Sequence, residues 1–249
     1  MICTRCRLVQ YCSPTCQKKQ WPTHKLVCKA PLTTSSEAAS ASATTASTKA
    51  SKKASPAQLH AFLLACAAGR LKEVRLACDS GISLDQQGKD GYTALIEASE
   101  RGHLDIVRLL CERGAALDLR SDNGSTALYM AAQEDHLDVV RLLCERGAAL
   151  DIQGTDDGTT ALHVASCLNH LGIVRILCER GAVIDIQRTA TGSTALCMAS
   201  QNGHLDIVRL LCERGCNTLL PTDQTPHAMA VALHGIDSPI ALFLKNYPH

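Results

Sequence analysis

Aromatic residues are scarce in this sequence: they make up 3% of its 249 residues, with one Trp, four Tyr and two Phe. Large single cores and enzyme pockets normally use aromatic side chains to fill space. A chain with so few rings must bury small aliphatic groups instead, and hydrophobic residues do amount to 46%. This composition favours thin, stacked helices.

Long apolar runs are also absent. The longest, Ala61 to Ala68, has eight residues, far below the roughly 18 to 20 that a membrane-spanning helix needs. The first residues include Cys3 and Cys6 and lack the apolar segment of a secretory signal. Fourteen cysteines without such a signal indicate a reducing compartment, so we expect a cytoplasmic or nuclear protein.

Negative charge is missing from the first 30 residues, which hold six Lys and Arg but no Asp or Glu. Residues 31–56 are almost wholly Ala, Ser and Thr with a net charge of +2, and residues 57–249 carry −7. A stretch such as 31–56 buries too little apolar surface to offset the entropy of ordering it. We therefore predict a basic domain at 1–30, a flexible linker at 31–56 and an acidic domain at 57–249.

From residue 58 onward the sequence repeats itself. The pattern Gly-x-Thr-Ala-Leu begins at Gly91, Gly124, Gly158 and Gly192, and its threonines lie 33, 34 and 34 residues apart. The block that starts at Gly102 and ends at Gly114 recurs letter for letter from residue 203. Each unit is predicted to hold a Thr-capped first helix and an amphipathic second helix that stops at a left-handed glycine.

This pattern and period resemble the ankyrin repeat over most of residues 57–249. The resemblance implies an all-α solenoid of about five full units and a shortened C-terminal cap, each unit having two helices and a hairpin. We place the extra residue of the 34-residue units in the exposed hairpins. Because the histidines and cysteines that begin with His103 and Cys78 recur once per unit, we interpret them as structural, with the cysteines as core residues that form no disulfides with each other.

The same resemblance implies a surface for a protein partner. In ankyrin-repeat proteins the first helices and the hairpin tips form a concave face that binds another protein. Positions that differ between near-identical units mark this face here, with Tyr92 at a hairpin tip. The predicted partner-binding residues are Tyr92, Ile96, Glu97, Tyr129, Met130 and Gln133. The alternative is sequence drift after recent duplication.

The first 28 residues contain Cys3-x2-Cys6-x5-Cys12-x3-Cys16-x7-His24-x3-Cys28. Thiolate and imidazole groups at such spacing are typical of a Zn²⁺ site. The segment resembles the MYND finger, whose four ligand pairs bind two zinc ions in a cross-braced order. The resemblance implies one complete zinc site and one half site, because the first cysteine pair of the family is absent. The complete site is Cys3, Cys6, His24 and Cys28, and the half site is Cys12 and Cys16.

Three explanations of the missing pair remain open at this point: a chain truncated before Met1, a degenerate finger with one zinc, or a rearranged site. The rearranged site would use Cys3, Cys6, Cys12 and Cys16. MYND fingers receive short proline-rich peptides, and Gln17 and Trp21 match the positions of the family's peptide contacts. The alternative for Trp21 is that it only packs the core of the finger.

These features predict a monomeric, non-catalytic adaptor that binds proteins at both domains. One alternative is a regulator that binds nucleic acid through the basic domain at residues 1–30, although zinc-bound thiolates reduce the positive charge of this domain and no basic helix accompanies it. The other is a fragment of a larger MYND-containing enzyme, since MYND fingers occur in SET-domain lysine methyltransferases. No catalytic motif stands outside the repeats.

Overall fold

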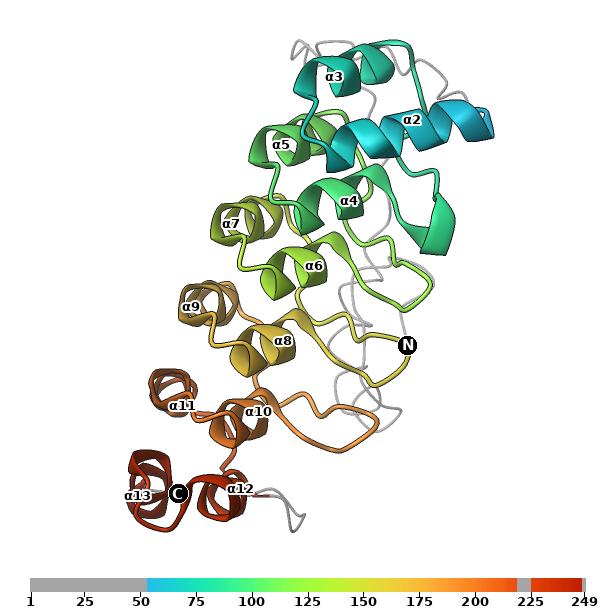
Figure 1. Ribbon diagram of the computed structural model, residues 1–249. Coiled ribbons are helices and arrows are strands. Elements are labelled where there is room, and N and C mark those ends of the chain that lie inside the picture. Colours follow the sequence, from blue (N-terminus) through green and yellow to red (C-terminus); the bar gives the residue numbers. More distant parts are fainter. Residues whose placement is uncertain (1–52, 219–224, 248–249) are drawn as a thin grey trace, which may run out of the picture. The chain divides into compact units, whose positions relative to one another are not determined.

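The computed structural model describes residues 53–218 and 225–247 of the chain (Figure 1). This part is helical, with one short 3-10 turn, η1 (Lys89–Gly91). None of its helices is long and apolar enough to span a bilayer. The helices are α2 (Pro56–Ala67), α3 (Leu71–Asp79), α4 (Ala94–Glu100), α5 (Leu104–Glu112), α6 (Ala127–Gln133), α7 (Leu137–Glu145), α8 (Ala161–Cys167), α9 (Leu171–Glu179), α10 (Ala195–Gln201), α11 (Leu205–Glu213), α12 (Pro226–His234) and α13 (Pro239–Asn246).

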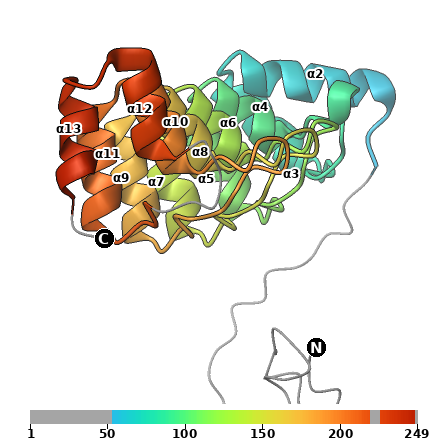
Figure 2. The same ribbon diagram turned by 90° about the horizontal axis from the view of Figure 1, so that it is seen from below.

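The helices form two parallel rows, which are seen from two directions in Figures 1 and 2. The first helix of each unit (α2, α4, α6, α8, α10, α12) packs against the first helices of its neighbours, and the second helices (α3, α5, α7, α9, α11, α13) form the other row. In Figure 1 the connecting loops extend from the side of the first helices. The prediction of an all-α stack of ankyrin type is confirmed, with α12 and α13 as the shortened last unit.

The first helices begin at threonine caps, as the repeat predicts. The hydroxyl of Thr93 accepts a hydrogen bond from the backbone N–H of Ile96 at 3.3 Å, and Thr126 does the same for Tyr129 at 3.2 Å. Such a side chain satisfies one of the amides that a helix start leaves unpaired. Buried alanines such as Ala98 then let neighbouring first helices approach closely.

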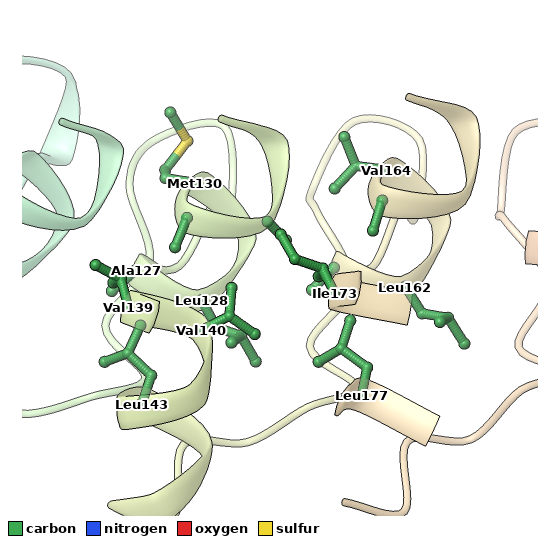
Figure 3. Close-up of a cluster of buried hydrophobic side chains, with 14 of the residues drawn as sticks. Ala127, Leu128, Met130, Val139, Val140, Leu143, Leu162, Val164, Ile173 and Leu177 are labelled. Carbon is green, nitrogen blue, oxygen red and sulfur yellow. The ribbon is translucent and has the colours of Figure 1, made fainter. Parts of the chain in front are cut away.

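The second helices are amphipathic and end at left-handed glycines. In α5 the buried residues are Ile106, Val107, Leu109 and Leu110. Gly114, with φ +81°, follows the helix and reverses the chain, a conformation that costs little only for glycine. Figure 3 shows aliphatic side chains of successive second helices in the core, including Leu143 of α7 and Leu177 of α9. The core is therefore filled mainly by aliphatic side chains, with Phe62 of α2 as the buried aromatic residue among those described, which explains the low aromatic content.

Each unit is tied to the next by bonds that recur with the repeat. The ring Nε2 of His136 lies 2.9 Å from the carbonyl oxygen of Glu100, one unit earlier, and three other histidines make equivalent bonds. Carboxylates at the loop starts accept from backbone amides of the next unit, as Asp118 does from Ala149 at 2.9 Å. Ion pairs join exposed side chains of successive second helices: Arg113–Asp79, Arg146–Glu112, Arg180–Glu145 and Arg214–Glu179. His103, His136 and His204 are therefore structural, as predicted, whereas Nδ1 of the fourth recurring histidine, His170, lies 3.3 Å from the carboxylate of Asp135.

The recurring cysteines differ from the prediction that they are core residues. Cys212 is buried, but its four equivalents are only half-buried: Cys78, Cys111, Cys144 and Cys178. Their position lies at the border between the buried stripe of the second helix and its exposed side, because it follows directly after the fully buried position of Leu110 in α5. All the cysteines of the described part are free thiols.

The first unit of the stack includes residues that precede the predicted boundary at residue 57. Ser55 caps α2, which starts at Pro56. The backbone N–H of Ala54 also donates to the side-chain oxygen of Gln86 at 2.8 Å, and the Gln86 amide donates back to the carbonyl of Ala54. These residues, which the composition placed in the linker, therefore pack as part of the first unit.

Candidate interaction surface

The loops between units close in a regular way and position the start of each first helix. A backbone bond joins Gly88 N–H to the carbonyl of Tyr92 at 2.8 Å, and its equivalent joins Ser121 to Ser125 at 2.9 Å. In the longer units the bond spans one more residue, from Gly154 to Thr159. The extra residue therefore lies inside the loop, as the sequence predicts.

This bond corrects the placement of Tyr92. The residue lies at the base of its loop, next to the cap of α4, and not at the tip, because its carbonyl is the acceptor that closes the loop. Its side chain is half-buried, and its hydroxyl lies 4.0 Å from the sulfur of Met130 in the following unit. Burial raises the pKa of the Tyr92 hydroxyl, and the nearby carboxylate of Glu100 raises it further. The structure thus brings two of the predicted residues, Tyr92 and Met130, into contact.

A groove of about 410 Å³ lies beside Tyr92, between α2, η1 and α4. We call it the α2–α4 groove. Its apolar wall is formed largely by α2, and its polar wall by η1 and the last turn of α4. It is lined by His60, Leu63, Leu64, Ala67, Lys89, Asp90, Tyr92, Glu97, Glu100 and Arg101.

Glu97 is the predicted residue that shapes the electrostatics of this groove. Burial raises the pKa of its carboxyl group, and the neighbouring Glu100 raises it further, while Arg101 lowers it. Within the described part of the chain, the Glu97 carboxylate has no hydrogen bond or ion pair. A half-buried carboxylate without a partner favours a ligand that carries a hydrogen-bond donor or a positive charge.

Two of the predicted partner-binding residues do not reach the surface. Ile96 is 1% exposed and Met130 is 5% exposed. Both lie on the part of the first helix that faces neighbouring helices, since α4 and α6 pack against each other as well as against their second helices. A buried side chain offers a partner no area, so these residues support the surface from beneath.

Tyr129 and Gln133 lie one unit further along the same side and are half-buried. Burial raises the pKa of the Tyr129 hydroxyl, and the charge of Asp157 adds to this effect. The hydroxyl has no hydrogen bond among the described residues. Asp157 is paired with Arg188, whose Nε also donates to the Thr159 hydroxyl at 3.0 Å. Tyr129 therefore presents an unbonded hydroxyl beside a fixed ion pair.

His163 occupies the position of Tyr129 in the next unit but is buried. Its ring Nδ1 accepts from the backbone N–H of Thr160 at 3.2 Å, and the backbone N–H of His163 donates to the Thr160 hydroxyl at 3.4 Å; the two bonds form a capping box. Burial lowers the pKa of the His163 ring to about 4. The ring is therefore a neutral structural group.

Two exposed leucines lie on this side of the stack outside the predicted set of partner-binding residues. Leu64 in α2 is 51% exposed, and Leu168, at the end of α8, is 46% exposed. Aligning Gly69 of the irregular first unit with Gly102 would have placed Leu64 in register with Glu97. We define the first-helix face as the set Leu64, Tyr92, Glu97, Tyr129, Gln133 and Leu168.

The predicted zinc ligands and peptide contacts lie outside the described residues. These are Cys3, Cys6, Cys12, Cys16, Gln17, Trp21, His24 and Cys28. Among residues 53–218 and 225–247, no group of three or more His, Cys, Asp or Glu side chains is placed to hold a metal ion.

Comparison with known proteins identifies the family to which the chain belongs. Three overlapping segments, residues 42–121, 113–189 and 156–223, match ankyrin repeats, and residues 1–28 match the MYND finger. The paired helices and their recurring bonds define a helical repeat protein. The chain belongs to the ankyrin-repeat family and carries an N-terminal MYND finger, a zinc-binding module.

Two curated relatives share only a short segment with the chain. Histone-lysine N-methyltransferase SMYD3 of Homo sapiens is 59% identical over 29 residues, which is 12% of this chain and 7% of that protein. SET domain and MYND-type zinc finger protein 6 of Schizosaccharomyces pombe is 57% identical over 28 residues, 11% of this chain and 6% of that protein. The chain thus spans less than a tenth of the length of these relatives.

Proposed function

We propose that the chain is a non-catalytic adaptor that binds one protein at the first-helix face and a short proline-rich peptide at the finger. Ankyrin repeats and MYND fingers are both modules that bind proteins, which supports this general role. One observation carries the proposal for the repeats. The second helices α5, α7, α9 and α11 are nearly identical, whereas the first-helix face changes at each step, from Leu64 to Glu97 and from Tyr92 to Ser125.

Tyr92 and Tyr129 are the proposed anchors of the repeat partner. Tyrosine combines a large apolar ring with a hydroxyl, and residues of this type dominate the binding energy of many interfaces. Tyr92 is supported from beneath by Met130 and lines the α2–α4 groove, where Glu97 needs a donor. We therefore expect the partner to place a basic or donor side chain beside Glu97.

A capture experiment tests this surface. The full chain is used to isolate a partner, and its affinity is then measured for Tyr92→Ala and Tyr129→Ala. Each substitution is expected to weaken binding by roughly thirtyfold or more, because truncation of an interface hot spot costs about 2 kcal/mol or more. Leu76→Ala is the control, because Leu76 is 71% exposed on α3, in the row of second helices. Unchanged affinity of both tyrosine variants would exclude the first-helix face.

For the finger we propose that Cys3, Cys6, His24 and Cys28 hold one zinc ion. Bound zinc would supply the folding energy of so small a unit. Zinc content of purified variants separates this site from the rearranged one. Cys28→Ala is expected to lose the metal, whereas Cys12→Ala is expected to keep it. Loss of zinc in the Cys12 variant and retention in the Cys28 variant would favour the rearranged set.

Gln17 and Trp21 are the proposed peptide contacts. The flat indole of Trp21 suits the extended polyproline conformation. Trp21→Ala is expected to keep its zinc and to lose affinity for a proline-rich probe peptide. A variant with full zinc content and full affinity would show that Trp21 only packs the finger.

The relatives' names raise an enzymatic alternative. SMYD3 is named as a histone-lysine N-methyltransferase, but the shared segment covers 7% of it. We propose no catalysis by this chain, whose residues from 57 onward follow the repeat pattern. Methyl transfer to histones by the purified chain would contradict this.

We also propose that the protein is located in the cytoplasm or the nucleus and that it does not bind nucleic acid. A steeply salt-dependent affinity for DNA or RNA would contradict the second proposal.

A further inference from the structure

The last full unit holds a pair of thiols that the other units lack. Cys212, in the last turn of α11, is the cysteine that recurs with the repeat, but Cys216 replaces an alanine. The equivalent residues in the preceding units are Ala115, Ala148 and Ala182, and all three are buried. Cys216 therefore places a sulfur atom in a buried site that holds only the methyl group of an alanine in the preceding units.

The backbone explains why these two sulfurs meet. Gly215, with φ +78°, turns the chain back at the end of α11. The N–H of Gly215 donates to the carbonyl of Cys212 at 2.8 Å, and the N–H of Cys216 donates to that of Leu211 at 3.2 Å. This Schellman-type ending places Cys216 over the last helical turn. Its sulfur lies 3.9 Å from the sulfur of Cys212.

The two thiols are buried, and their pKa values are shifted in opposite directions. Cys212 is 1% exposed and Cys216 is 8% exposed. The S–H of Cys216 donates to the sulfur of Cys212 and lowers the pKa of the Cys212 thiol, whereas the same bond, together with burial, raises the pKa of the Cys216 thiol that gives the proton. A thiolate is thus favoured at Cys212, beside a second thiol that can resolve it.

We propose that Cys212 and Cys216 form an oxidation-sensitive dithiol, which a hydroperoxide converts to a disulfide within the chain. The Cys212 thiolate attacks the terminal peroxide oxygen, the O–O bond breaks, and sulfenic acid forms as the alcohol or water leaves with the proton. The sulfur of Cys216 then attacks the sulfenic sulfur, its proton joins the departing hydroxyl, and water leaves. Two thiols are oxidised by two electrons, and one peroxide is reduced.

The position gives the cross-link a structural consequence. Tyr247, next to α13, donates its hydroxyl to the carbonyl of Cys212 at 2.6 Å, and Arg209 of α11 lies over the ring of Phe243 at 5.8 Å. The end of α11 is thus the site on which α13 is fastened. A disulfide here would fix the turn that supports the last unit of the stack.

The test uses the full, zinc-loaded chain. It is treated with hydrogen peroxide and denatured in an alkylating maleimide, and it is then cut before aspartates. Cleavage before Asp206 and Asp223 leaves both cysteines in one peptide, 206–222. Loss of two hydrogens makes this peptide about 2 Da lighter, and it is expected to take up no maleimide. Peptides 105–117 and 138–150 each hold one recurring cysteine, Cys111 or Cys144, and are expected to be alkylated.

Two variants make the outcome decisive. Cys216→Ala restores the residue of the other units and is expected to abolish the mass loss, leaving a sulfenic acid at Cys212 that dimedone traps. Ala148→Cys recreates the pair beside Cys144 and is expected to form a second disulfide, in peptide 138–150. The proposal is overturned if peptide 206–222 carries two maleimides after a peroxide dose that fully oxidises glutathione in a parallel sample. It is also overturned if the sulfurs of Cys212 and Cys216 bond to other peptides instead.

Discussion

The stacking of neighbouring loops can be tested at one glycine. Gly124 has φ +81°, and a Cβ atom at this position would lie 2.4 Å from the backbone nitrogen of Thr155 in the next loop. That nitrogen donates to the carbonyl of Asn123 at 3.2 Å, a bond that ties the two loops together. Gly124→Ala must therefore push the next loop away and weaken this bond. Gly147 has φ +86° with nothing within 4 Å of its Cβ position, which makes Gly147→Ala the matched control.

The two substitutions share one cost and differ in another. A left-handed conformation costs an alanine about 1 to 2 kcal/mol relative to glycine, and both variants pay it. Gly124→Ala also loses a hydrogen bond between units, worth about 0.5 to 1.5 kcal/mol. We expect a loss of about 1 to 2 kcal/mol for Gly147→Ala and roughly 1.5 to 3.5 kcal/mol for Gly124→Ala.

The assay is urea unfolding followed by the circular dichroism of the helices, with the free energy of unfolding compared between the variants. Repeat stacks can unfold in parts, so amide hydrogen exchange provides a second measurement. Gly124→Ala is expected to speed exchange at Thr155, and Gly147→Ala is not. Equal destabilisation by both variants, with unchanged exchange at Thr155, would refute the reasoning that contact between loops stabilises the stack.

Three further outcomes follow from the structure. Because the pKa of His163 is about 4 when folded but about 6.5 when unfolded, the unfolded state binds more protons between these values. Stability should therefore fall as the pH drops from about 6.5 to about 4, by up to roughly 3 kcal/mol. His163→Gln, which keeps a capping-box residue, should reduce this dependence in urea unfolding at pH 7 and pH 5; an identical pH dependence in the variant would contradict the assignment. Arg146→Gln removes an exposed ion pair with Glu112 and should change the free energy of unfolding by less than about 1 kcal/mol. Leu143→Ala empties a fully buried site and should cost about 2 to 5 kcal/mol by the same measurement; a smaller loss than that of Arg146→Gln would contradict the described core.

The stack of paired helices could be predicted from the sequence because it depends on local features that recur in each unit. Threonine caps, left-handed glycines and the aliphatic stripe of the second helix each act within one unit, and each appears at the predicted residue, from Thr93 to Gly114. Recurrence of a histidine in successive units also indicates a structural role, since a bond such as that of His136 to the carbonyl of Glu100 can be made in successive units.

The exposed residues of the first helix were harder to predict. The internal first helices α4, α6, α8 and α10 have seven residues each and touch the units on both sides, as α4 does with α2 and α6, so only a narrow strip remains exposed. Ile96 and Glu97 are adjacent in sequence, yet one is buried and the other lines a groove. The alignment of units shows which positions vary, but not which side chains are buried: the buried Ile96 aligns with the half-buried Tyr129, and the buried Met130 aligns with Glu97. The place of Tyr92 likewise depends on a backbone bond that no side-chain pattern reports.

The bonds between units have a consequence for how such a protein can evolve. Most internal units offer similar acceptors to the unit that follows and similar donors to the unit that precedes, as His136 and Arg146 illustrate. An internal unit can therefore be copied or deleted in the gene, and the new neighbours would find matching partners across the join. The number of units can therefore change during evolution while the chain still folds. Such copying accounts for the letter-for-letter recurrence of residues 102–114 at 203–215.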